Sequence, residues 1–334
     1  MQLTERDLEL VDAVQINPRA GWSAIARPLG ISAVTAARRW AALVAEGAVW
    51  TGAVMGPLLF RGAVLEFACR PAAVDSLVDA LNAMPDVLTV GRTVGEFDVY
   101  ALTAAPTTQT LISSLSTRFA GLPAERLRAR AYTRVHGGPQ WRLNVLNPAQ
   151  SAQVRDPARP RHEAAGFAPA DRDLFFALAQ DARRSYADLS QELSAPPQVV
   201  RRRLERLRRA GWVSLRADLA RPLAGWPLAA LLWLEVPHAD RPRLAHELGT
   251  RAAVRFCAST VAPANLVAIV NLRAPEELDE VLTALAADLP SVAVREHRLV
   301  LRLHKVNGHI LDPEGRSVRV VPVDPWIAED SLPQ

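Results

Sequence analysis

Residues 38–49 read RRWAALVAEGAV and residues 202–213 read RRLERLRRAGWV, so the two stretches align at a shift of 164 positions. The same shift places Asp7 on Asp171, and the alignment runs without a gap from residue 7 to residue 49. A shift of 167 continues the match further along the chain. Self-similarity over most of the chain predicts two copies of one structural unit.

The first part of each copy has the pattern of three short helices. In the first copy, Thr4 followed by Asp7 predicts a capped helix start, and a second short helix is expected over residues 22–29. Ser32 is expected to be the N-cap of a third helix, which Gly47 ends. A compact turn before a third helix is typical of a helix-turn-helix, and the extended residues after Gly47 resemble its wing.

The third helix of each copy carries the candidate DNA-contacting side chains. Arginine suits bidentate contacts with phosphate and guanine, and the second copy is the more basic one, with six arginines between residues 201 and 209. We expect phosphate contacts from this helix rather than a merely solvated surface. The candidates are Ser32, Thr35, Arg38 and Arg39 in the first copy, and Gln198, Arg201, Arg202, Arg203 and Arg206 in the second.

The second part of each copy alternates strands and helices in the ferredoxin-like order βαββαβ. Here Leu65-Glu66-Phe67 matches Leu232-Trp233-Leu234. One face of each sheet is left without helices, so the two sheets are expected to pack on each other as an intramolecular pseudo-dimer. The expected elements are residues 63–69, 72–84, 87–94, 97–103, 107–120 and 127–135, and then 229–236, 241–250, 254–261, 266–272, 276–288 and 292–303.

The expected fold is therefore α+β, with two winged helix-turn-helix domains alternating with two ferredoxin-like domains. A stretch rich in Pro, Ala, Arg and Gln separates the copies and is expected to be a linker. The tail has no counterpart, and its residues 318–323 are a candidate edge strand. The expected boundaries are residues 1–52, 53–146, 147–166 for the linker, 167–217, 218–312 and 313–334 for the tail.

Composition excludes several classes of protein. Apolar residues make up 49% of the 334 residues and charged residues 22%, as in ordinary globular proteins. Cys69 and Cys257 are too few for a disulfide framework or a zinc site. The longest apolar candidate, residues 226–236, is too short and too interrupted to span a bilayer. We expect a cytoplasmic protein without a membrane partner.

Nothing in the sequence points to catalysis. The seven histidines show no spacing typical of metal ligands or of a nucleophile and its base, and glycine-rich phosphate loops and nucleophile elbows are absent. The sequence therefore predicts no metal, no cofactor and no enzymatic activity.

The run Leu29-Gly30-Ile31-Ser32, followed by Arg38-Arg39 and by Gly47-Ala48-Val49, resembles the helix-turn-helix of Lrp/AsnC (feast/famine) regulators. Residues 94–98, VGEFD, resemble the Gly-x-Tyr/Phe-Asp loop of their sensing domain. The resemblance implies a tandem fusion of two such subunits that binds specific double-stranded DNA, forms homo-oligomers and responds to an amino acid or a related small molecule. The residues implied in effector binding are Thr93, Gly95, Glu96 and Asp98.

The two copies differ at these places. In the second copy the loop reads Ala262-Pro263-Ala264-Asn265, without the glycine and the acid. In the first copy, Pro28 should weaken or end the second helix, and Trp40-Ala41-Ala42 lies where charge is more common. We therefore expect the second helix-turn-helix to supply most of the DNA affinity, and the first loop to supply most of the effector contact.

Two other functions stay open. Siroheme decarboxylases are similar in plan and also occur fused, but they resemble this chain less at the sensing loop, where they carry Arg-Glu-His followed by Tyr-Asn. Arg295-Glu296-His297 is present here only on the last expected strand, without that continuation. The other alternative is an architectural DNA-coating protein without a ligand, which would show little sequence preference and a steep salt dependence.

Overall fold

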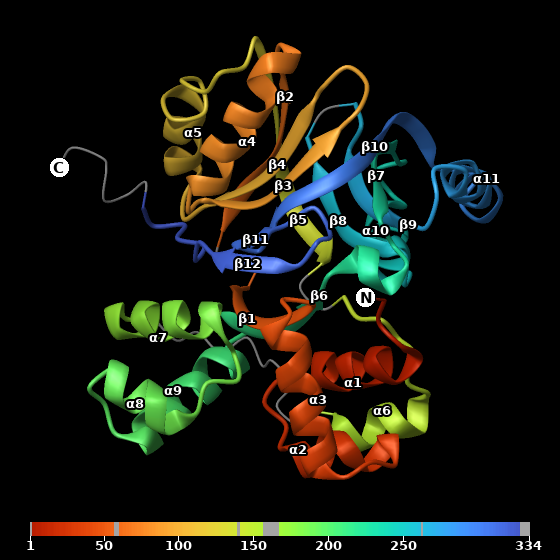
Figure 1. Cartoon of the computed structure of the whole chain (residues 1–334). Coiled ribbons are helices and arrows are strands. Elements are labelled where there is room, and N and C mark those ends of the chain that lie inside the picture. The colour runs from red at the N-terminus through yellow and green to blue at the C-terminus, as the bar shows by residue number, and fades with distance from the viewer. Residues whose placement is uncertain (1, 57–59, 139–140, 156–166, 262, 328–334) are drawn as a thin grey trace. The chain divides into compact units, whose positions relative to one another are not determined.

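The computed structural model describes residues 2–56, 60–138, 141–155, 167–261 and 263–327 (Figure 1). The chain forms two compact units, one of residues 1–59 and 142–220 and the other of residues 60–141 and 221–334. Each unit combines matching parts of both copies. The first unit holds both helix-turn-helix regions, and the second holds both ferredoxin-like regions. No described helix is long and apolar enough to cross a membrane.

Both helix-turn-helix regions have the expected three helices followed by a strand (Figure 1). The first copy contains α1 (Glu5–Ile16), α2 (Trp22–Ala26), the 3-10 turn η1 (Arg27–Leu29), α3 (Ala33–Ala45) and β1 (Val49–Met55). The second contains α7 (Pro169–Gln180), α8 (Tyr186–Glu192), α9 (Pro197–Arg209) and β6 (Val213–Leu219).

Local signals in the sequence set these helix boundaries. Thr4 and Asp7 form the expected capping box at α1, and the Ser32 hydroxyl accepts a hydrogen bond from the Thr35 N–H at the start of α3. Gly47 follows α3 with a left-handed φ of 66°, which a side chain would disfavour. At Pro28 the α-helical part of the second helix has already ended and given way to a 3-10 turn, as the missing proline N–H leads one to expect.

The strands that follow the two third helices pair with each other. β1 and β6 form an antiparallel two-stranded sheet over seven residue pairs, from Val49 opposite Leu219 to Met55 opposite Val213. The wing-like strand predicted for each copy is present, but the sequence did not predict its partner. Each strand satisfies its backbone groups on the matching strand of the other copy, which joins the two helix-turn-helix regions.

The expected linker begins with a helix rather than with irregular chain. α6 (Pro148–Val154) has Asn147 as its N-cap and buries Ser151 and Val154. It packs beside α1, α2 and η1. The preceding segment is anchored by the buried carboxylate of Asp12, which accepts hydrogen bonds from the side chain of Arg142 and from nearby backbone N–H groups. Residues 156–166 of the expected linker lie outside the described residues.

The second unit contains both βαββαβ patterns (Figure 1). The first comprises β2 (Arg61–Ala68), the 3-10 turn η3 (Pro71–Ala73), α4 (Val74–Ala83), β3 (Val87–Thr93), β4 (Val99–Ala105), α5 (Thr108–Ser116) and β5 (Arg126–Gly137). The second comprises β7 (Leu228–Glu235), α10 (Arg241–Thr250), β8 (Val254–Thr260), β9 (Leu266–Leu272), α11 (Glu277–Asp288) and β10 (Ala293–Val306), preceded by the 3-10 turn η4 (Arg221–Ala224).

The two four-stranded sheets are continuous with each other. The strand order is β12-β11-β10-β3-β4-β2-β5-β8-β9-β7, and β7 also pairs with β10, so eight strands form a closed sheet. β5 pairs first with β2 and then, beyond Tyr132, with β8 of the other copy. β10 likewise pairs with β7 and then, beyond Val300, with β3. The expected pseudo-dimer is present, but the sheets share their long strands at the edges besides packing face to face.

Three apolar clusters hold this unit together. One lies between the first sheet and α4 and α5, and a second lies between the second sheet and α10 and α11. The third lies inside the closed sheet and draws side chains from both copies, including Tyr100 and Trp233. Cys69 and Cys257 are both free and buried, and burial raises the pKa of Cys257 to about 12.

A hairpin of residues 309–320, which runs into the tail, adds to this sheet. β11 (His309–Leu311) pairs with β10, and β12 (Ser317–Val320) pairs with β11. β12 confirms an edge strand in the tail, but it covers only residues 318–320 of the expected 318–323. Residues 328–334 of the tail lie outside the described residues.

Candidate functional site

Helix α9 is seated by a narrow apolar stripe. Val200, Leu204 and Leu207 are buried, and their spacing of four and three residues places them on one face of the helix. The opposite face is left to polar side chains. Gln198, Arg201 and Arg202 are all exposed on it.

Two of the arginines of α9 are held by a buried acid. The carboxylate of Asp171 on α7 has no exposed surface, and it lies 2.5 Å from a guanidinium nitrogen of Arg206 and 3.6 Å from one of Arg203. An uncompensated buried carboxylate is costly, so these ion pairs serve the packing of α9 on α7. Arg203 and Arg206 are thus oriented from within the domain, while Arg201 pairs with Glu205 on the helix surface.

The first helix-turn-helix repeats this arrangement with a single arginine. Arg39 donates to both carboxylate oxygens of Asp7, at 2.5 and 2.7 Å. Burial alone would raise the pKa of Asp7, but hydrogen bonds from Arg39 and Thr4 outweigh burial and lower it. The position that matches Arg206 is Ala42, so the second arginine is missing.

The remaining candidates lie on the exposed face of α3. Ser32, Thr35 and Arg38 are exposed, although Ser32 also serves as the helix cap. Val34 is 76% exposed beside them. Among the described residues, neither Arg38 nor its counterpart Arg202 has an ion-pair or hydrogen-bond partner. These two matching guanidinia are therefore available to an outside anion.

A pair of arginines joins the two helix-turn-helix regions. Arg19 donates to the carbonyl oxygens of Ala182 and Arg184, at 2.7 and 2.9 Å. Arg183 donates to the carbonyl oxygens of Pro18 and Ala20, at 2.6 and 3.1 Å. We call Arg19 and Arg183, with the carbonyl groups that they bind, the arginine clasp.

The arginine clasp is symmetric in its ring contacts as well. The guanidinium of Arg19 lies 4.3 Å from the centre of the Tyr186 ring, and that of Arg183 lies 4.0 Å from the centre of the Trp22 ring. Burial lowers the pKa of Arg183 to about 10, so it stays protonated at neutral pH. Every contact has its counterpart at the shift of 164, so the two helix-turn-helix regions are related by a pseudo-twofold axis.

The expected sensing loop is built around backbone hydrogen bonds. The Thr93 hydroxyl donates to the Phe97 carbonyl oxygen at 2.7 Å, and the Asp98 carboxylate accepts from the N–H of Cys69 at 2.9 Å. Gly95 has a φ of 121°, which requires glycine. Glu96 is about half exposed and pairs with Arg126 at 3.0 Å. Of the four candidates, Glu96 is the one whose charged group faces solvent.

The second copy keeps the loop's hydrogen bonds, although one of the two side chains differs. Asn265 takes the place of Asp98 and accepts from the N–H of Val236, which matches Cys69. The Thr260 hydroxyl donates to the Ala264 carbonyl oxygen, as Thr93 does to Phe97. The loss of charge between Asp98 and Asn265 thus leaves the structural role unchanged. Ala262, which replaces Gly95, lies outside the described residues.

An ionic cluster that the sequence did not predict lies inside the closed sheet. Glu66 accepts from Arg128 and Arg298, each at 2.8 Å, and the indole N–H of Trp233 donates to it at 3.3 Å. Glu296 accepts from Arg128, Arg130 and Arg298 at 2.7 to 2.8 Å. Burial would raise the pKa of Glu296, but these three arginines outweigh it and lower the pKa to about 2.

One signal could have revealed part of what the sequence missed. Arg19 and Arg183 align at the shift of 164, so an identical exposed-type residue in both copies marked the arginine clasp in advance. The ionic cluster had no such signal, because Glu66 aligns with Trp233 and the two differ in every property. Sequence-local patterns also gave no sign that residues of β2, β5 and β10 would meet.

Comparisons with known proteins agree with this architecture. The sequence profile of winged helix-turn-helix DNA-binding domains matches residues 168–214. An uncharacterized HTH-type transcriptional regulator of Pyrococcus abyssi is 24% identical over 136 residues, which cover 40% of this chain and 86% of that protein.

Among solved structures, the siroheme decarboxylase NirDL is similar over 94% of this chain and 96% of its own, with a TM-score of 0.59 and 14% identity. Its complex with an iron-uroporphyrin III analogue covers 90% of this chain and 93% of that chain, with the same TM-score. At this identity the likeness concerns the fold. The chain thus has a tandem, Lrp/AsnC-type winged helix-turn-helix fold.

Proposed function

We propose that the chain is a sequence-specific DNA-binding transcription regulator of the Lrp/AsnC type, and that α9 supplies most of its affinity for double-stranded DNA. The observation that carries this proposal is the exposed face of α9, with Gln198, Arg201 and Arg202 in its N-terminal half. Recognition helices of helix-turn-helix proteins contact base edges with their N-terminal residues. Arginine pairs with guanine and glutamine with adenine in bidentate fashion.

The two reading helices present different chemistry. α3 offers Val34, Thr35 and Arg38, with one charge and an exposed valine that suits the methyl group of thymine. α9 offers more positive charge, so its contribution to phosphate binding is larger. A regulator with this pair of helices is expected to read two unlike half-sites, spaced by about one helical turn of DNA or a multiple of it.

We assign the effector to the first sensing loop, in the class of amino acids and related small molecules. Glu96 and Arg126 lie 3.0 Å apart and are both about half exposed, so they offer an anion and a cation to the two charges of a zwitterion. Arg298 of the other copy also approaches Glu96, at 3.5 Å. An effector bound here would contact both copies and would change how the two ferredoxin-like halves are arranged relative to each other. Further association of chains is also expected, and sedimentation measures it.

The structural similarity to NirDL suggests a second candidate function, decarboxylation of a tetrapyrrole. We propose that the chain does not have this activity. The arginines inside the closed sheet are already paired with Glu66 and Glu296. His297, the histidine of the Arg-Glu-His stretch, lies exposed on β10. Absorbance spectra after addition of siroheme, with product analysis, test this directly. A bound and decarboxylated tetrapyrrole would overturn the proposal.

The deciding experiment is selection of genomic DNA fragments by the purified chain, with and without a panel of amino acids, followed by footprinting. A regulator gives a footprint of limited length whose strength changes with an effector. An architectural protein would instead protect long stretches with little preference. The same footprint measured with Arg202→Ala and Arg38→Ala identifies which helix carries the affinity, since the two positions match.

A further inference from the structure

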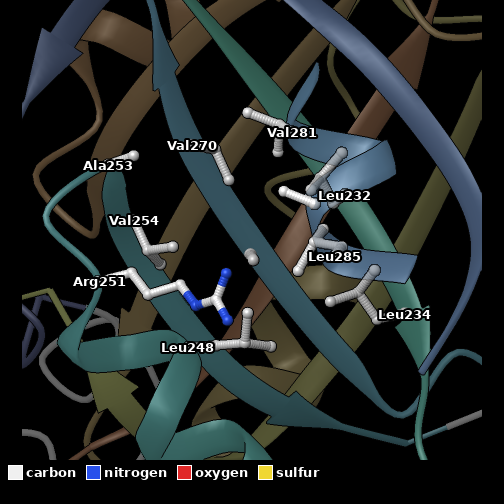
Figure 2. Close-up of a pocket in the computed structure, with 11 residues that line it drawn as sticks. Leu232, Leu234, Leu248, Arg251, Ala253, Val254, Val270, Val281 and Leu285 are labelled. Atoms are coloured by element: carbon white, nitrogen blue, oxygen red, sulfur yellow. The ribbon is translucent and has the colours of Figure 1, made fainter. Parts of the chain in front are cut away.

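The second ferredoxin-like half contains a cavity between its sheet and its two helices (Figure 2). The volume is about 100 Å³. The walls are aliphatic and come from three strands and both helices. Representative wall residues are Leu232 and Leu234 of β7, Leu248 of α10, Val254 of β8, Val270 of β9 and Leu285 of α11.

One charged side chain reaches this cavity from among the described residues that line it. Figure 2 shows the guanidinium of Arg251, just after α10, pointing toward the leucine side chains of the opposite walls. Arg251 also pairs with Glu247 at 3.4 Å and with Asp288 at 3.1 Å. Both acids are more exposed than the arginine, whose side chain is 31% exposed, so they can turn to solvent when another anion arrives.

The first copy has different residues at the matching positions. At the shift of 167, Phe67 stands where Leu234 stands in the second copy, and Met84 stands where Arg251 stands. Phe67 is fully buried in its own apolar cluster, and so is Phe119 from the turn after α5. The second copy thus combines a smaller wall residue with a cation, and the cavity is a property of that copy's own residues.

We propose that this cavity binds a carboxylate carried on a branched aliphatic chain of about four carbons. In another protein, an apolar cavity of about 150 Å³ binds benzene, which corresponds to about 25 Å³ of cavity for each carbon atom. At that ratio, a cavity of 100 Å³ holds roughly four carbon atoms. The aliphatic walls exclude polar groups from the interior. The guanidinium of Arg251 supplies a forked, charged donor for the carboxylate at the rim.

Two kinds of molecule share this chemistry. A branched aliphatic amino acid such as leucine would add an ammonium group, for which Glu247 and Asp288 are suitable partners. A simple branched acid such as isovalerate would lack it and would compete with those acids for Arg251. Binding to the cavity does not depend on the proposed function, whereas any effect of the ligand on DNA affinity rests on it.

The test is calorimetric titration of the full chain, without DNA, with leucine, isovalerate and isoamyl alcohol at up to millimolar concentrations. Leu234→Phe, which copies the first repeat, should abolish binding of all three by filling the cavity. Arg251→Met, which also copies the first repeat, should weaken the carboxylates by about tenfold or more while sparing the alcohol. Arg273→Met removes an exposed arginine of the same half that does not line the cavity, and it should leave binding of all three ligands unchanged.

Thermal unfolding of each variant verifies that it is folded, and methyl NMR shifts of the wall leucines locate the ligand if Leu234→Phe is unstable. Tighter binding of leucine than of isovalerate identifies the zwitterion, and the reverse order identifies the simple acid. Saturable binding that Leu234→Phe leaves intact, or the absence of binding by all three ligands, would overturn the proposal. Because DNA is absent, a failure here leaves the DNA-binding proposal standing.

Discussion

Replacement of Arg183 by alanine should loosen the two helix-turn-helix regions from each other. The guanidinium donates two hydrogen bonds to backbone carbonyl groups, at 2.6 and 3.1 Å, and stacks 4.0 Å from the centre of the Trp22 ring. Hydrogen bonds from charged donors contribute about 1.5–3 kcal/mol each, and the ring contact about 0.5–2 kcal/mol. The cost of burying the cation, which also lowers its pKa to about 10, offsets part of this gain.

The expected net loss is about 2–3 kcal/mol in the free energy of unfolding, because water only partly replaces the lost donors. Urea unfolding followed by tryptophan fluorescence measures it, since Trp22 reports on the arginine clasp itself. Arg19→Ala should lose a similar amount, because its contacts are the symmetric ones. Arg184→Ala is the matched control, and the loss of its partly exposed ion pair with Glu192 should cost only about 1 kcal/mol.

If Arg183→Ala and Arg184→Ala lose the same small amount, the arginine clasp contributes nothing and the two helix-turn-helix regions are held by the β1–β6 pairing and by the packing of α1 and α7 against these strands. Spin labels on α3 and α9 give a second measure, because the distance distribution should broaden in Arg183→Ala and stay narrow in the control.

Three other predictions follow from the contacts described above. Arg202→Ala should weaken operator binding more than Arg38→Ala and should reduce the slope of log affinity against log salt by about 1; equal losses would refute the leading role of α9. Asp171→Ala should cost about 2–3 kcal/mol in urea unfolding, because it leaves Arg203 and Arg206 without their buried partner, whereas a change within error would show that the pair adds nothing. The folded-state pKa of Glu296 lies below its ordinary value of 4.5, at about 2, so its stabilising effect is complete above pH 4.5 and is lost as the pH falls toward 2. The stability difference between the wild type and Glu296→Gln should therefore shrink over that range, and a constant difference would contradict the assignment.

The ionic cluster shows what fusion of two copies makes possible. Glu66 and Trp233 occupy matching positions, and they contact each other inside the closed sheet. In a dimer of identical chains, a residue on the twofold axis would meet its own copy. Two buried glutamates would then repel, and two tryptophans would need twice the space. With both copies in one chain, an acid and an indole N–H can face each other across the pseudo-twofold axis.

The same freedom explains why matching positions differ elsewhere. Arg128 lies opposite Glu66 in one strand pair. In the matching pair a register shift between Val294 and Glu296 places Glu296, rather than Arg295, opposite Trp233. A cation in one copy and an anion in the other complete a cluster that neither copy could form with itself. The cavity of the second half is another such difference, since Leu234 and Arg251 replace Phe67 and Met84.

The elements and their order follow from the sequence alone. The shift that aligns Asp7 with Asp171 reveals the repeat, and caps such as Ser32 and breaks such as Pro28 act on residues within one turn of the helix. The βαββαβ order likewise comes from local apolar periodicity. These signals are readable because the physical effect and its cause lie only a few residues apart.

The pairing between copies was decided by the tertiary structure. β1 matches β6 and β5 matches β10, so matching strands have similar apolar patterns. By this pattern alone, a strand could pair equally well with a strand of its own copy or of the other copy. Local periodicity cannot separate these choices. They are decided by contacts between residues more than a hundred positions apart, such as Arg183 on the Pro18 carbonyl oxygen, Arg298 on Glu66, and β1 against β6. The repeat was therefore evident from the sequence. Which strands of the two copies pair with each other was decided by the long-range contacts that stabilise the complete folded structure.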